Sequence, residues 1–442
     1  MGHDFNTKTS AGNAKRGERS LGMTVAEKIL SVHSGERDVL PDDYVTAKID
    51  FARIRGLSRH QDLLIKAGLE KGLRKLWDPA RVLSAPGDNV TCLNAVSLAA
   101  RYRRDVELAR EYGVANFYDE SEGIAHQIMV EKGHVHPGEL IVGDDSHTLI
   151  YGALNCASAA ISDLEMTYVL TTGELWFRVP ETLRIELRGE LQPPVMPKDL
   201  FLHVAKEHGP DAALGRSIEW VGDTQSISID GRLCITCSST ELSARFSMFE
   251  ADEAAAAYVK ARSRAPFTPV RSDADASFEE KYHVDLDDLE PYVALPHGFE
   301  VVKPVSEVEG IRIDKARVGA CSDGRVEDLA VVARILKGRR VHPDVVFYVS
   351  PASRMVLREA IDQGIITSLL DSGVVVGPPG CCVCTSHLLV TAPGEVDVSA
   401  TTRNFIGRHG SIEAQIYLAS AATAAASALK GEIADPRKVV VA

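Results

Sequence analysis

The chain has no long hydrophobic run, and this absence excludes one class of protein at the outset. No stretch of the 442 residues approaches the roughly 20 consecutive apolar residues that a membrane-spanning helix requires. The N-terminus also lacks the apolar core of a signal peptide. It is polar and rich in Gly, Ser and Lys, which predicts a flexible extension over residues 1–22. We therefore expect a cytoplasmic protein without a membrane partner.

Positive charge is scarce as well. Lys and Arg number 49 against 62 Asp and Glu, which gives a net charge of −13. A nucleic-acid-binding surface needs a basic patch, so this balance argues against a nucleic-acid partner, and an anionic substrate would need a local basic pocket. The hydrophobic content of 45% is nevertheless ample for packed cores, and a chain of this length usually forms two or three domains.

Cysteine is sparse, at eight residues, but three of the cysteines have a spacing that could bind a metal or a cluster. Cys321 lies in V-G-A-C-S-D-G-R, and Cys381 and Cys384 lie in G-P-P-G-C-C-V-C-T. In a reducing compartment this pattern favours metal ligation over disulfides. Three thiolates suit a 4Fe-4S cluster with one iron left open for substrate. Zinc, with Cys382 or His387 as a further ligand, and plain buried thiols are the alternatives that spacing alone leaves open.

Alternating strand and helix patterns predict α/β domains with largely parallel sheets. Ligands of such sheets bind beyond the carboxyl ends of strands, so both cysteine loops are expected to face one crevice. The stretch 262–310 is rich in Pro, Asp and Glu and is expected to link a middle domain to a final one. The clearest expected strands lie within residues 138–143, 345–349 and 374–380, and the clearest expected helices within residues 330–337 and 419–430.

Several further motifs follow one another in a fixed order. They are G-I-A-H-Q-I-M-V-E-K-G from residue 123, G-D-D-S-H-T at 143–148 and T-T-R-N-F-I-G-R-H-G at 401–410, together with the cysteine loops. From Met23 to the D-P-R near the C-terminus, the chain resembles the aconitase superfamily, and in particular the large subunits of 3-isopropylmalate dehydratase and of two-subunit homoaconitases. The resemblance implies three α/β domains around a central cleft, which we place at residues 23–190, 191–290 and 291–442, the last with the cysteines.

The resemblance also implies an activity. Members of this family are iron-sulfur-dependent hydro-lyases or isomerases that dehydrate and rehydrate a malate-like or citrate-like hydroxy acid. Cys321, Cys381 and Cys384 match the ligands of a 4Fe-4S cluster, whose open iron acts as a Lewis acid. The swivel domain of the fused aconitases has no counterpart in this sequence. We therefore expect a separate small swivel-domain subunit to complete the site, and this chain alone to be nearly inactive.

Four positions match catalytic groups of the family, and a neighbouring one matches a substrate-binding position. Asp145 and His147 belong to the D-S-H-T motif, in which a carboxylate orients an imidazole, and Ser146 between them matches a substrate-binding position. His126, in G-I-A-H-Q, matches another active-site histidine. Glu241 aligns with a glutamate that contacts iron-bound water or hydroxyl. Taken alone, each histidine would more often be structural, and it is the motif context that favours catalysis.

Two arginines match family residues near the substrate and the cluster. Arg403 and Arg408 lie in T-R-N-F-I-G-R. A guanidinium presents a planar fork that pairs with both oxygens of a carboxylate, so arginine suits this role better than lysine. The alternative is two ordinary surface charges.

Other positions depart from the family pattern. Where the family has Asp-His after an early strand, this chain has Asp88 and Asn89. Asp88 keeps the catalytic carboxylate, but asparagine cannot exchange a proton near neutral pH. Cys382, between two expected ligands, is predicted to be an inert neighbour, with an alternative ligand as the second interpretation. Further positions that differ from the family are Ser322, Asp323, Thr402 and Cys237.

These departures leave the substrate open. 3-Isopropylmalate and homocitrate are the reference substrates, and a methylated malate, citraconate or maleate are alternatives. Because the Asp-His histidine is missing, a second hypothesis is a one-way dehydratase or hydratase in a specialised pathway. A third is a non-catalytic, RNA-binding regulatory relative, against which the acidic balance argues.

Overall fold

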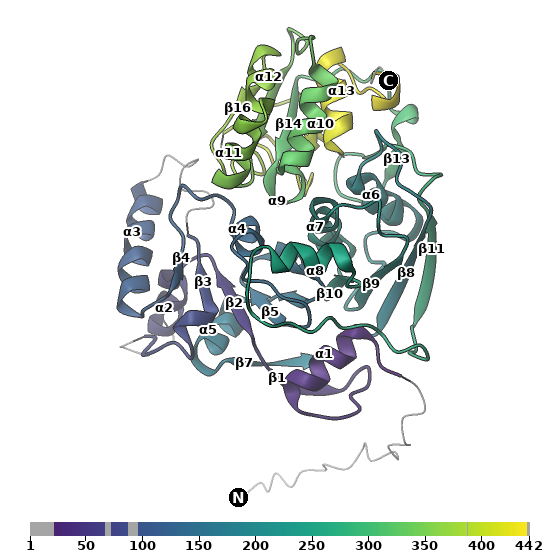
Figure 1. Ribbon diagram of the computed structural model, residues 1–442. Coiled ribbons are helices and arrows are strands. Elements are labelled where there is room, and N and C mark those ends of the chain that lie inside the picture. Colours follow the sequence, from purple (N-terminus) through teal and green to yellow (C-terminus); the bar gives the residue numbers. More distant parts are fainter. Residues whose placement is uncertain (1–21, 67–71, 87–95, 387, 440–442) are drawn as a thin grey trace, which may run out of the picture.

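The structure is a computed structural model that describes residues 22–66, 72–86, 96–386 and 388–439. Three groups of strands and helices surround a centre at which α4, α7 and α9 meet (Figure 1). This arrangement confirms the expected α/β class. Within the described residues, no helix is both long and apolar enough to cross a bilayer. The predicted N-terminal extension, apart from Gly22, lies outside the described residues, as do Asp88, Asn89 and His387.

The first group is built on a five-stranded parallel sheet of order β4-β3-β2-β5-β6. Its central strands read as apolar runs because helices cover both faces of a parallel sheet. The strands are β2 (Phe51–Ile54), β3 (Val82–Ser84), β4 (Asn116–Phe117), β5 (Leu140–Gly143) and β6 (Ala157–Ala160). The helices are α2 (Leu57–Lys66), η1 (Pro79–Arg81), α3 (Val96–Glu111), α4 (Ala125–Glu131), η3 (Ser146–Leu154) and α5 (Asp163–Thr172).

A short antiparallel pair and one helix flank this sheet. Strand β1 (Tyr44–Lys48) pairs with β7 (Glu174–Arg178), and α1 (Val25–Ser34) precedes them. Helix α1 begins at a capping box formed by Thr24 and Glu27 and ends at Gly35, whose positive φ of 74° favours glycine. These local signals fix both ends of the helix.

The second group is a parallel sheet of order β10-β9-β8-β11. Strand β8 already belongs to this sheet, although it precedes residue 190. The predicted domain boundaries stay a prediction. The strands are β8 (Thr182–Arg188), β9 (Ser217–Gly222), β10 (Phe246–Phe249) and β11 (Glu280–Asp285), and the helices are α6 (Pro197–His208), α7 (Ile229–Ser238), η4 (Ser239–Leu242) and α8 (Glu253–Lys260).

The third group contains a seven-stranded sheet of order β13-β12-β18-β17-β14-β15-β16, in which β12 runs antiparallel to both of its neighbours. The strands are β12 (Tyr292–Ala294), β13 (Val302–Pro304), β14 (Lys315–Gly319), β15 (Val346–Ser350), β16 (Val375–Val376), β17 (Val396–Ala400) and β18 (Gln415–Ala419). The helices are η5 (Val305–Glu307), α9 (Ala320–Asp323), α10 (Val326–Leu336), α11 (Arg354–Asp362), α12 (Ile365–Asp371), α13 (Ala421–Lys430) and η6 (Pro436–Lys438).

Each of the five ranges predicted as a clear strand or helix overlaps an element of that type in the structure. The interpretation of residues 262–310 as a linker, in contrast, is wrong in part. Residues 280–304 contain β11, β12 and β13. Strand β11 lies at the edge of its sheet, and half of its side chains are exposed. Hydrogen bonds between backbones hold such an edge strand in place, so it does not need the apolar side chains by which a strand is recognised in a sequence.

The topology brings the predicted motifs together. Loops after β14, β16 and β17 carry the cysteines and the arginines, and the loop after β5 leads into η3. Helix α7 packs against both η3 and α9, and so joins the first group to the third. The backbone N–H of Ile124 also donates to the carbonyl oxygen of Ala352 at 2.8 Å.

We expect Gly152→Ala to loosen η3, the helix that carries His147. A methyl group at this position would lie 1.7 Å from the carbonyl oxygen of Ser247 in β10, so the two elements would have to separate. Overpacking of this kind lowers the free energy of unfolding by about 3 kcal/mol, which thermal unfolding would register as a lower midpoint. In the control Gly310→Ala, the added methyl group meets no atom within 4 Å, and its left-handed backbone costs about 1–2 kcal/mol. Equal losses would contradict this packing.

Candidate functional site

Cys321 lies just after β14, at the start of α9. Its side chain is buried, and the backbone around it is fixed by Arg325. The guanidinium of Arg325 donates to the carbonyl oxygens of Cys321 at 2.7 Å and of Ser322 at 3.1 Å. It also donates to Gln127 Oε1 of α4 at 2.9 Å. A buried cation, 1% exposed, therefore holds this loop and connects it to the first group.

The second cysteine loop follows β16. The backbone N–H of Cys384 donates to the carbonyl oxygen of Cys381 at 3.1 Å, which closes the C-x-x-C turn. Arg408 Nη2 donates to Cys384 Sγ at 2.9 Å, and Thr402 Oγ1 lies 3.3 Å from the same sulfur. Cys382 is fully buried and takes part in a disulfide, which sets its sulfur apart from the thiols on either side.

Arg408 is the electrostatic neighbour that the three predicted ligands share. Burial would lower the pKa of Arg408, but the sulfurs of Cys384, Cys381 and Cys321 raise it. None of the three cysteines forms a disulfide. Sulfurs from two loops thus act electrostatically on one guanidinium, which contacts Cys384 directly, and this donor set fits a three-thiolate cluster site.

The zinc alternative is not tested, because His387, one of its expected ligands, lies outside the described residues. No three His, Cys, Asp or Glu side chains in that part of the chain are grouped closely enough to hold one metal ion. A cubane cluster places no such demand, because each thiolate binds a different iron.

Asp145 joins the two predicted catalytic histidines. Its Oδ1 lies 3.0 Å from His126 Nε2 and accepts the backbone N–H of His147 at 3.0 Å. His147 Nδ1 lies 3.4 Å from the same oxygen, and His126 Nδ1 lies 3.0 Å from the Tyr151 hydroxyl. Burial would raise the pKa of Asp145, but the hydrogen bonds from both histidines hold it well below its usual value. The carboxylate therefore stays charged and orients both rings.

The other ring nitrogen of His147 is the group most available for chemistry. His147 Nε2 is buried and has no hydrogen-bond partner among the described residues. It lies 3.9 Å from Glu241 Oε1. Burial would lower the pKa of His147, but the thiolate of Cys321 and the carboxylate of Asp145 raise it. An oriented imidazole with one free nitrogen is the arrangement that general acid-base catalysis needs.

Glu241, in η4, connects this histidine to an arginine. Arg403 Nε donates to Glu241 Oε1, and Arg403 has no other hydrogen-bond partner within the described residues. The neighbouring Thr240 hydroxyl donates to the carbonyl oxygen of Ser146 at 2.7 Å. The Ser146 side chain is half-buried, and its substrate-binding role stays a prediction.

Sequence reasoning missed the buried network beneath the sulfurs. Asp397 of β17 accepts from Arg317 of β14, from the Thr391 hydroxyl at 3.0 Å and from His409 Nδ1 at 3.0 Å. Arg317 Nη1 also donates to the carbonyl oxygen of Val383 at 3.1 Å. Burial and the Arg317 charge lower the pKa of His409 to about 4. The signal that could have indicated this network is a charged residue inside each of two largely apolar strands, Arg317 in β14 and Asp397 in β17.

Lys198 of α6 was missed as well, and it accounts for part of the unusual C-S-D sequence. Its buried ammonium pairs with Asp323, and donates to Ser322 Oγ at 3.1 Å and to the carbonyl oxygen of Thr401 at 2.6 Å. Burial would lower the pKa of Lys198, but Asp323 raises it. One cation therefore connects the loop of Cys321 to the loop of Arg403.

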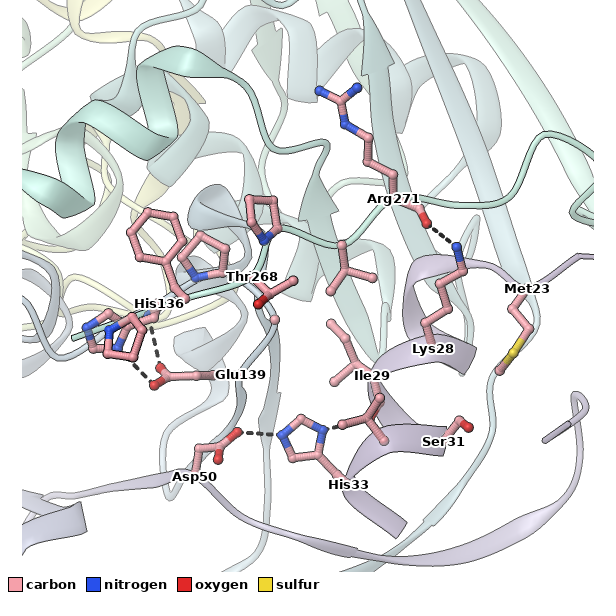
Figure 2. Close-up of a pocket in the computed structure, with 17 residues that line it drawn as sticks. Met23, Lys28, Ile29, Ser31, His33, Asp50, His136, Glu139, Thr268 and Arg271 are labelled. Atoms are coloured by element: carbon pink, nitrogen blue, oxygen red, sulfur yellow. Dashed lines mark hydrogen bonds and ion pairs between the residues drawn. The ribbon is translucent and has the colours of Figure 1, made fainter. Parts of the chain in front are cut away.

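A cavity of about 850 Å³ lies elsewhere in the molecule. It opens between α1 and the segment 266–271, and it contains the ion pairs of His33 with Asp50 and of His136 with Glu139 (Figure 2). None of the predicted site residues lines it. The candidate site is therefore defined by its side chains and not by this cavity.

The structure thus gathers nine predicted site residues, whereas Asp88 lies outside the described residues. Their contacts form two sets, one of sulfurs and one of acid-base groups, and the charge of the Cys321 thiolate, which raises the pKa of His147, acts between the two sets. The nine residues are His126, Asp145, His147, Glu241, Cys321, Cys381, Cys384, Arg403 and Arg408.

Comparison with known proteins gives the same family as the motifs. The aconitase family (aconitate hydratase) matches residues 96–309 and 297–431. The 3-isopropylmalate dehydratase large subunit 1 of Methanopyrus kandleri is 42% identical over 419 residues, 94% of this chain and 99% of that protein. The probable methanogen homoaconitase large subunit of Methanothermobacter thermautotrophicus is 39% identical over 424 residues, 94% of this chain and 98% of that protein.

A solved structure gives a more remote match. Aconitase X of Thermococcus kodakaraensis, in its holo form, has a TM-score of 0.45 and 12% identity over 86% of this chain and 89% of that chain, which is too distant to inform on the site. The family match and the two large subunits, in contrast, cover nearly all of the described chain. The chain therefore belongs to the aconitase family and is a hydro-lyase.

Proposed function

We propose that this chain is the large subunit of an iron-sulfur-dependent hydro-lyase that removes water from, and returns it to, a small malate-like or citrate-like hydroxy acid. The observation that carries the proposal is the position of His147, whose free Nε2 is buried within electrostatic reach of the Cys321 sulfur. The names of the relatives support the substrate class, since they are 3-isopropylmalate dehydratase and homoaconitase large subunits.

Cys321, Cys381 and Cys384 would hold a 4Fe-4S cluster. An open iron of such a cluster supplies a Lewis acid for the substrate hydroxyl and an adjacent carboxylate. Arg408 lies against Cys384 and balances the negative charge of the thiolates. Because the contacts described above fix both loops, the sulfurs are already in position before a cluster binds.

The remaining residues bind the substrate and move protons. Arg403 is anchored through Nε to Glu241, which leaves the Nη groups of its fork for a substrate carboxylate. His147 exchanges a proton at Nε2 with the departing or entering hydroxyl, while Asp145 holds the ring and stabilises its charged form. His126 fixes the same oxygen of Asp145 through its Nε2.

A small swivel-domain subunit is proposed to complete the site, because the relatives are themselves named large subunits. The test combines the anaerobically reconstituted chain with candidate small subunits and follows the unsaturated acid formed from 3-isopropylmalate, homocitrate or a methylated malate. We expect dehydration only when both subunits are present. A fully loaded complex that dehydrates none of these acids would contradict the proposal. Both positional isomers of the hydroxy acid at equilibrium would favour isomerisation over one-way dehydration.

Replacing any one of Cys321, Cys381 and Cys384 with serine should abolish cluster retention, because a hydroxyl does not substitute for a thiolate ligand. The measurement is the iron and acid-labile sulfide content after anaerobic reconstitution. Cys156→Ser is the matched control, because this buried free thiol donates to the carbonyl oxygen of Tyr151 at 3.1 Å, a bond that a hydroxyl can also make. Wild-type iron content in one of the three variants would remove that cysteine from the ligand set.

Arg403→Lys should raise the KM for the hydroxy acid at least about tenfold, or about 1.4 kcal/mol, because an ammonium cannot keep the Glu241 contact and also pair with both carboxylate oxygens. Steady-state kinetics of the complex measure this. Arg312→Lys is the control, since Arg312 pairs with Asp344 on the surface. An unchanged KM in Arg403→Lys would show that Arg403 does not bind the carboxylate.

A further inference from the structure

Two thiols lie in direct contact at the edge of the proposed cluster site. Cys237, in α7, donates a hydrogen bond to the sulfur of Cys321, in α9, and the two Sγ atoms are 3.4 Å apart. Both residues are free cysteines, buried to 3% exposure or less. The packing of α7 against α9 holds them together. Cys237 is also one of the positions at which this chain departs from the family pattern.

We propose that Cys237 is the resolving thiol of Cys321, so that the two form a reversible disulfide when Cys321 carries no metal and meets a peroxide. The biological meaning of this modification rests on the proposed function, in which Cys321 is a cluster ligand. The thiol pair itself does not depend on it. The contact distance must shorten from 3.4 Å to the bonded distance of about 2.05 Å, which is a small movement of two side chains.

The chemistry balances with hydrogen peroxide as the two-electron oxidant. The Cys321 thiol gives up its proton, its sulfur attacks one peroxide oxygen, and the O–O bond breaks. The departing hydroxide takes up that proton and becomes water, and Cys321 remains as a sulfenic acid. The Cys237 sulfur then attacks the Cys321 sulfur, the S–O bond breaks, and the hydroxyl leaves as water with the thiol proton of Cys237. Overall, two thiols and one peroxide give one disulfide and two waters. A small-molecule thiol reverses the reaction.

The surroundings favour this pair over other pairings. The sulfur of Cys384 faces Arg408 and Thr402, which hold it in place. Cys234 lies three residues before Cys237 on the same helix and is buried, but it makes no sulfur-sulfur contact in the described structure. The disulfide would block cluster insertion until it is reduced, and it would protect Cys321 from irreversible oxidation to sulfinic and sulfonic acids.

The test treats the metal-free, full-length chain with hydrogen peroxide, alkylates the remaining thiols and digests without reductant before mass spectrometry. Besides the disulfide of Cys382, which is present before treatment, we expect one cross-linked species that forms only with peroxide, is two hydrogens lighter than its separate peptides and joins the segments containing Cys237 and Cys321. It should disappear on reduction. A Cys321 linked to Cys381 or Cys384, or oxidised to the sulfinic acid in the wild-type chain, would overturn the proposal.

Cys237→Ser and Cys237→Ala provide the second measurement, and Cys234→Ser is their control on the same helix. After peroxide treatment and reduction, the amount of iron regained on reconstitution should fall several-fold in both Cys237 variants and stay at the wild-type level in Cys234→Ser. Equal recovery in all variants would overturn the proposal. Thermal unfolding checks that each variant is folded. The peptide measurement gives a result even if the chain never binds iron. Failure to bind iron would reject the proposed function, but it would not reject the disulfide.

Discussion

The buried ion pair of Arg317 with Asp397 is the interaction on which the site depends. Both side chains are fully buried, so each charge must be paired and hydrogen-bonded to offset the loss of water. Their partners are the backbone of the cysteine loop, Thr391 and His409. His409 in turn adjoins Arg408, which contacts the Cys384 sulfur. One pair between neighbouring strands thus fixes the loops that present two of the thiols and their shared cation.

The acid-base groups are organised in the same way around a single carboxylate. Asp145 orients two histidines from the first sheet, while Glu241 orients Arg403 from the second group of elements. Lys198 and Arg325 are buried cations that tie these parts to the loop of Cys321. Three sheets therefore contribute to one site, and buried ionic contacts hold the loops where the sheets meet.

Much of this site is predictable from the sequence, because the motifs with cysteine, histidine and arginine follow strands whose carboxyl ends meet at one crevice. The supporting charges are visible in the sequence, but their pairing was not predictable. Arg317 and Asp397 lie inside apolar strands, and their pairing across 80 residues leaves no local pattern. The edge strand β11 was taken for part of a linker because charged, exposed residues conceal a strand held by its backbone. The departure at Cys237 is visible in the sequence, but its contact with Cys321 requires the fold.

The central claim is that three thiols from two loops hold an iron-sulfur cluster beside an oriented histidine. Its most direct test is the iron and acid-labile sulfide content of the chain after reconstitution without oxygen. The account predicts a brown protein that approaches about four irons and four sulfides per chain, as a cubane cluster requires. A colourless protein that binds zinc, or no metal, under the same conditions would contradict it.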